Sequence, residues 1–125
     1  MTKETHPVYW AYFENYANRL KETLDKNKKL RKRGWGASYK YSITKDGKIT
    51  NMKGSTFQND KFDELVKEII LSVKPEPFSE EMESDDFMFD TFLGYYKYNE
   101  LNISHGFSLG YNKPVIHITI SSKKR

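Results

Sequence analysis

Three histidines, His6, His105 and His117, are the first candidates for acid-base or metal chemistry, because imidazole titrates near neutral pH. They lie in different segments, and none has helical metal-ligand spacing with another. Ser104 precedes His105, but neighbouring residues of an extended chain point in opposite directions, so we expect no nucleophile and base pair there. His117 alternates with isoleucines, which predicts a position on the solvent face of a strand.

Carboxylates gather between Glu76 and Asp86, and carboxylates can act as ligands of a calcium ion. This segment lacks the alternating ligands and central glycine of a calcium-binding loop, so we expect a solvated acidic loop. The chain contains no cysteine, which excludes disulfides, Cys-ligated zinc and thiol nucleophiles. Because no nucleophile, base and orienting group combine, we predict that the protein is not an enzyme and uses no metal or cofactor.

A basic run, KNKKLRKR, extends from Lys26 to Arg33 in a chain whose net charge is +4. Trp35, Tyr39 and Tyr41 follow it, and cations beside aromatic rings can hold phosphates and stack on bases. The alternative is that the rings pack on helices while the cations solvate a helix end. The candidate nucleic-acid-binding residues are Lys28, Lys29, Arg31, Lys32 and Arg33.

The length of 125 residues suits one domain, and we predict a single soluble domain over residues 1–125. No apolar run of about 18 residues is present, so we expect no direct insertion into a membrane. Residues 1–7 have neither the basic nor the apolar region of a signal peptide. The protein is therefore either cytoplasmic or a domain separated from an upstream anchor, and the localisation stays open.

Two segments have the periodicity of amphipathic helices. The first runs from Val8 to about Lys26, with Pro7 suited to its first turn, and its apolar residues are Tyr9, Phe13, Tyr16, Leu20 and Leu24. The second should begin after Asn59 or Asp60 as N-cap and end after Lys74, before Pro75. Its core-facing residues are Phe62, Leu65, Val66, Ile69, Ile70 and Val73.

Strands are indicated by alternating apolar and polar residues, as at Tyr39, Tyr41 and Ile43. A three-residue loop, Lys45-Asp46-Gly47, would place Ile43 opposite Ile49, and a bulge or early strand end is expected near Lys53-Gly54. The pattern predicts further strands over Phe87 to Tyr98 and Val115 to Ile120. Asn102 to Leu109 is interpreted as a loop or a weak short strand.

The order of an aromatic helix, a hairpin with Asp-Gly at its tip, a helix and Pro-x-Pro resembles the C-terminal domain shared by TonB and TolA energy-transducing proteins. The likeness covers about residues 8–82 and rests on four segments: YFENYANRLKETL (Tyr12 to Leu24), YKYSITKDGKITNM (Tyr39 to Met52), DKFDELVKEIILSV (Asp60 to Val73) and Pro75 to Phe78. It implies an α+β fold with an antiparallel sheet of three to four strands packed against two helices. An extended aromatic C-terminal hairpin would occupy residues 83–125.

The resemblance also implies a protein-protein interaction domain that binds partners by adding a strand to a sheet edge. The partner would be another protein, such as an envelope or outer-membrane protein met in the periplasm, or a second copy in a homodimer. The expected edge residues are Tyr95, Tyr96, Tyr98, Ile116, Ile118 and Ile120. The alternative function is a nucleic-acid-binding α+β module that uses the basic run 26–33.

Overall fold

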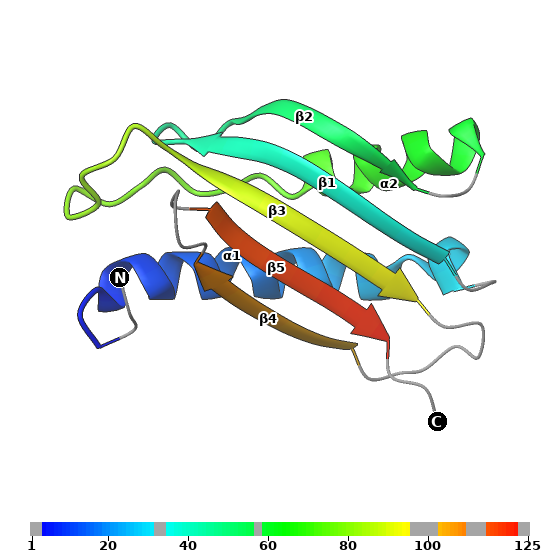
Figure 1. Cartoon of the computed structure of the whole chain (residues 1–125), viewed down its shortest axis with the longest axis horizontal. Coiled ribbons are helices and arrows are strands. Elements are labelled where there is room, and N and C mark those ends of the chain that lie inside the picture. Colours follow the sequence, from blue (N-terminus) through cyan, green and yellow to red (C-terminus); the bar gives the residue numbers. More distant parts are fainter. Residues whose placement is uncertain (1–3, 32–34, 57–58, 96–102, 110–114, 123–125) are drawn as a thin grey trace.

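The computed structural model describes residues 4–31, 35–56, 59–95, 103–109 and 115–122. Its elements are α1 (Pro7–Lys26), the 3-10 helix η1 (Lys28–Arg31), β1 (Trp35–Thr44), β2 (Ile49–Thr56), α2 (Asp60–Ser72), β3 (Asp86–Tyr95), β4 (Ile103–Leu109) and β5 (Val115–Ser122). Figure 1 shows the strands as one layer, with α1 and α2 behind it as the second layer. The α+β class and the packing of a sheet against two helices are therefore confirmed.

The sheet has five strands in the order β2-β1-β3-β5-β4. Strands β2, β1 and β3 form the expected antiparallel part, and β4 is antiparallel to β5. The pair β3 and β5 is parallel, so the sheet is larger than expected and is not wholly antiparallel. The segment 83–125 is correspondingly not one hairpin, because β3 pairs with β1 and only β4 and β5 form a hairpin with each other.

Both predicted helices are present. Helix α1 has Pro7 in its first turn, and α2 begins after Asn59, whose side chain accepts a hydrogen bond from the Phe62 N–H at 2.9 Å. Helix α2 ends at Ser72, slightly earlier than expected. The residue before a proline avoids the helical conformation, which explains why the helix stops short of Pro75.

The β1–β2 hairpin has the predicted register, because Ile43 lies opposite Ile49. Gly47 has a φ of 79°, the left-handed conformation that the three-residue loop requires. The bulge lies about two residues nearer to this loop than expected, since the register shifts between Lys40 and Ser42. It falls beside Asn51, whose φ of 56° is unusual for a residue other than glycine.

The core lies between the sheet and the helices and is rich in aromatic rings. Phe89, at 1% exposure, stacks on Tyr41 with ring centroids 6.0 Å apart. Phe13 makes a T-shaped contact with Phe89, with ring centroids 5.9 Å apart. The other face of β3 is open, with Met88 at 47% and Phe92 at 48% exposure. The helices therefore cover one face of the sheet.

A chain of hydroxyl groups runs through this core. The hydroxyls of Tyr16 and Tyr41 are 2.7 Å apart, and the Tyr41 hydroxyl is 2.9 Å from Thr91 Oγ1. Each buried hydroxyl is thus hydrogen-bonded, as burial requires. Burial raises the pKa of Tyr41 to about 12, so this network is uncharged at neutral pH.

Candidate partner-binding edge

The two strands expected to form the docking edge lie inside the sheet. Strand β3 is flanked by β1 and β5, and β5 is flanked by β3 and β4. Ile116, Ile118 and Ile120 are buried, at no more than 1% exposure. The prediction that these strands are edges is therefore wrong, because neighbours on both sides already use their main-chain groups.

Among the tyrosines expected at this edge, Tyr95 is the last residue of β3, and its backbone lies opposite Trp35. The side chain of Tyr95, together with Tyr96 and Tyr98, lies outside the described residues.

The sheet ends instead at β2 and β4, which Figure 1 shows along its upper and lower borders. In an antiparallel edge strand, every second residue turns its N–H and C=O groups away from the neighbouring strand. Such unpaired groups form a template on which another chain can pair. The two edges of this sheet differ in how far they offer that template.

Strand β2 has an interrupted edge. The bulge beside Asn51 breaks its regular spacing, and Gly54 has a φ of 127°. Lys48, just before the strand, and Lys53, in its second half, are both exposed. Bulges and edge lysines are devices by which natural sheets prevent pairing, so β2 offers no continuous template.

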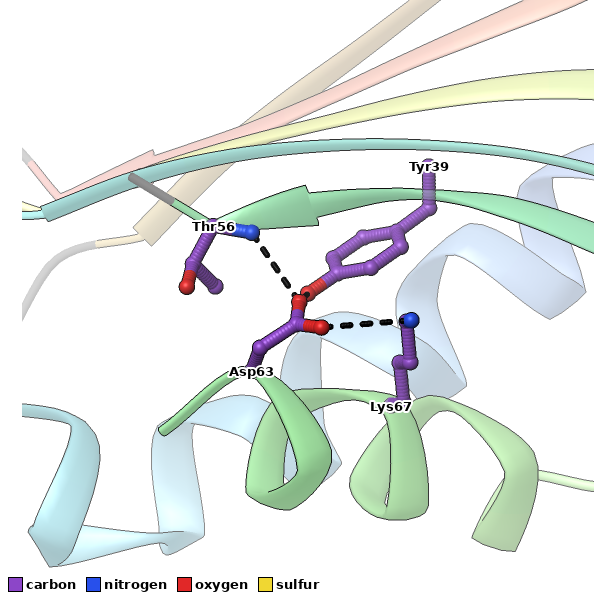
Figure 2. Close-up of polar contacts among 4 residues, drawn as sticks. All are labelled: Tyr39, Thr56, Asp63 and Lys67. Atoms are coloured by element: carbon purple, nitrogen blue, oxygen red, sulfur yellow. Dashed lines mark hydrogen bonds and ion pairs between the residues drawn. The ribbon is translucent and has the colours of Figure 1, made fainter. Parts of the chain in front are cut away.

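The end of β2 is further closed by Asp63 of α2, as Figure 2 shows. Asp63 Oδ1 accepts hydrogen bonds from the Thr56 N–H at 3.0 Å and from the Tyr39 hydroxyl at 2.6 Å. Its Oδ2 lies 3.2 Å from Lys67 Nζ. The last main-chain donor of β2 is therefore occupied within the domain.

This cluster shifts two pKa values. Burial by itself would raise the pKa of Asp63, but the hydrogen bonds from Tyr39 and Thr56 and the Lys67 charge outweigh it, so the pKa lies below its usual value. Burial first, and then the bond to the Asp63 carboxylate, raise the pKa of Tyr39. The carboxylate and the neutral phenol are thus the forms that the fold favours.

Asp63→Asn is expected to lower the free energy of unfolding by about 1 to 3 kcal/mol at neutral pH, because three donors lose a charged acceptor. Since the folded pKa is depressed, the stabilisation is present above the unfolded pKa of about 4 and is lost as the pH falls through the folded value. Urea unfolding at neutral pH and at about pH 3 measures both effects. The exposed Glu64, changed to Gln, is the control, and an equal deficit at both pH values would contradict the assignment.

Strand β4 has a regular edge. It pairs with β5 without a register shift from Ile103, opposite Ser122, to Leu109, opposite Ile116. Within the described residues, no strand pairs with its other side. Its sequence, ISHGFSL, contains no lysine, arginine, carboxylate or proline, so it lacks the devices found at β2. The outer edge of β4 is the candidate binding site.

The sequence leaves this segment open as a loop or a weak short strand, and the structure shows the strand. Ile103, Phe107 and Leu109 alternate with small or polar residues, which is the period of a strand. Gly106 in the middle of the segment weakens this signal, because glycine has a low preference for strands. Pairing with β5 overrides that local preference.

The basic run lacks the aromatic part of a nucleic-acid surface. Trp35 is buried and donates its Nε1–H to the Leu30 carbonyl at 2.6 Å, and Tyr39 and Tyr41 are also buried. The prediction that these rings could stack on bases is wrong, because they belong to the core. Of the candidate cations, Lys29 is exposed, while Lys32, Arg33 and the side chains of Lys28 and Arg31 lie outside what the structure describes.

The described residues contain no group of three or more metal-ligating side chains placed to hold a metal ion. In the same part of the chain, no helix combines the length and apolar character needed to span a membrane. Comparison with known proteins found no matching protein family, no similar curated protein and no similar solved structure. The resemblance to TonB and TolA stays a prediction.

Proposed function

We propose that this protein is a protein-interaction module that binds an extended segment of its partner as an added strand along the outer edge of β4. One observation carries the proposal: within the described residues, the sheet ends at one side on a regular strand of seven residues without Lys, Arg, Asp or Glu, and at the other on an interrupted strand. Strand addition obtains its affinity from main-chain hydrogen bonds. The resemblance to TonB and TolA makes proteins of the cell envelope the first partners to test.

The position of β4 in the sheet supports this role. Its inner neighbour β5 is held by strands on both sides and buries Ile116, Ile118 and Ile120. The edge strand is therefore paired with a strand that belongs to the core, so the domain presents a preformed strand to its partner.

Extended peptides selected from a display library are expected to protect alternate amides of Ile103–Leu109 from hydrogen exchange, because pairing places the N–H groups on the outer edge in new hydrogen bonds. Prolines at Gly106 and at Phe107 form a matched pair, since neighbouring residues turn their N–H groups to opposite edges of a strand. One of them removes a donor from the outer edge and should weaken peptide binding by about tenfold or more while the circular dichroism stays native.

The other proline removes a donor to β5 and should lower stability as well. Protection of β2 amides instead of β4 amides, or unchanged peptide affinity in both proline variants, would overturn the proposal.

A further inference from the structure

The sequence of β4 reads similarly in both directions from its centre, Gly106. Serines stand two residues before and two residues after it, at Ser104 and Ser108. Ring-bearing residues, His105 and Phe107, flank it directly, and aliphatic residues, isoleucine and leucine, end the strand. When two copies of this strand run antiparallel with their glycines opposite, serine therefore lies opposite serine, an aliphatic residue opposite an aliphatic one, and His105 opposite Phe107.

We propose that β4 pairs with β4 of a second copy of this chain, antiparallel about a two-fold axis at Gly106. The pairing joins two five-stranded sheets into one continuous sheet, with the helices of both copies on the same face. The inference rests on the proposed strand addition and names the partner of that edge. A symmetric pair of this kind is the simplest closed assembly, because it uses the same surface twice and leaves no copy of that edge open.

Symmetry and length select this register. In a two-fold pair, the residue opposite Ser104 is Ser108 of the second copy, and the reverse also holds. Only the axis at Gly106 engages the whole of β4, because moving it to His105 or Phe107 leaves residues at one end without partners. A slip by one residue is excluded, because it would set residues whose N–H and C=O groups face the outer edge opposite residues whose groups face β5.

The composition of β4 suits self-pairing. A charge near a two-fold axis meets a like charge on the second copy, and this strand has no Lys, Arg, Asp or Glu. Gly106 at the axis allows two backbones to approach closely. The register provides about six to eight main-chain hydrogen bonds, because alternate residue pairs each exchange two. Strand β2, with its bulge and exposed Lys53, would bring lysines together and cannot pair regularly.

The first test introduces charges at Ser104 and Ser108, which the register places opposite each other. The parent chain is expected to dimerise in analytical ultracentrifugation over a micromolar concentration series. The Ser104→Lys, Ser108→Lys variant should dissociate, because both cross-strand pairs then oppose two lysines. The Ser104→Lys, Ser108→Glu variant places opposite charges across the strands, so its dimer dissociation constant should be about tenfold or more lower than that of the double-lysine variant. Circular dichroism confirms that both variants fold.

The second test reads the register directly, since the chain has no cysteine of its own. Gly106→Cys should form a disulfide with its own copy under mild oxidation, because opposite Cα atoms in an antiparallel pair are about 4.5 to 5.5 Å apart. Ser104→Cys alone should not, since its copy lies four residues along, about 13 Å away. A mixture of Ser104→Cys and Ser108→Cys should form the mixed disulfide.

A monomer at every concentration, or a dimer that the paired lysines do not weaken, would overturn the self-pairing. The proposed function is tested separately by the selected peptides. If the chain is monomeric and peptides still protect the β4 amides, strand addition stands and only the choice of partner is wrong. If neither a second copy nor a peptide protects those amides, both proposals fall.

Discussion

Phe89→Ala is expected to lower the free energy of unfolding by about 3 to 5 kcal/mol, because it deletes a fully buried aromatic ring. Phe89 lies at the centre of the aromatic core, with Tyr41 stacked on it and with the edges of Phe13 and Tyr16 at 5.9 and 5.6 Å between ring centroids. These neighbours come from α1 and β1, so they cannot all move into the space that the ring leaves. The loss therefore includes the cavity as well as the transfer of the ring to water.

Phe92→Ala is the matched control, because it removes the same side chain from the same strand. Phe92 lies on the open face and is 48% exposed, so its loss should change stability by about 0.5 kcal/mol or less. Urea unfolding followed by circular dichroism compares the two variants under one condition. Similar losses of unfolding free energy in both variants would contradict the assignment of Phe89 to the buried face of β3 and Phe92 to the open face.

Gly54→Ala is expected to destabilise the protein by about 2 to 4 kcal/mol, through backbone strain and a steric clash together. The φ of Gly54 is 127°, a conformation that residues with a side chain rarely adopt. A Cβ atom there would overlap the Ser38 carbonyl oxygen of β1. This carbonyl cannot retreat easily, because β1 is held between β2 and β3.

The neighbouring Lys53→Ala variant controls for the loss of chain contacts in β2. Lys53 is exposed and has an ordinary backbone conformation, so a change of about 0.5 kcal/mol or less is expected. Urea midpoints give the comparison, and hydrogen exchange of the β1 and β2 amides locates the effect. Equal midpoints for the two variants would contradict the close approach of Gly54 to Ser38.

Predictions from the sequence succeeded for features that interactions between residues close together in the sequence determine. The helical periods, the Asn59 cap of α2 and the loop that sets Ile43 opposite Ile49 each depend on contacts within a few residues. The bulge was expected two or three residues late, because its position depends on Asn51 taking a left-handed conformation. Local chemistry alone does not say which of several polar residues will do so.

The site was predicted in the wrong strands for a related reason. Alternation at Ile116, Ile118 and Ile120 correctly indicated a strand, but it cannot tell an edge strand from an interior one. Strand order depends on which distant strands pair, and here β5 enters beside β3 in parallel after β4 reverses the chain. The bond from Tyr39 to Asp63 is also long-range, since the two residues are 24 positions apart, whereas Thr56 is only seven positions from Asp63.

The sequence by itself thus determined the fold class, the two helices and the face of each main strand that is apolar, because periodicity and caps act locally. It also contains the near-palindrome of β4 around Gly106, whose meaning depends on where that strand lies. Only the tertiary structure decided that β3 and β5 are interior, that Trp35, Tyr39 and Tyr41 are core residues, and that β4 is a regular edge. The physical reason is that main-chain hydrogen bonds between strands depend little on residue type, so the packing of the whole domain determines which strands are neighbours.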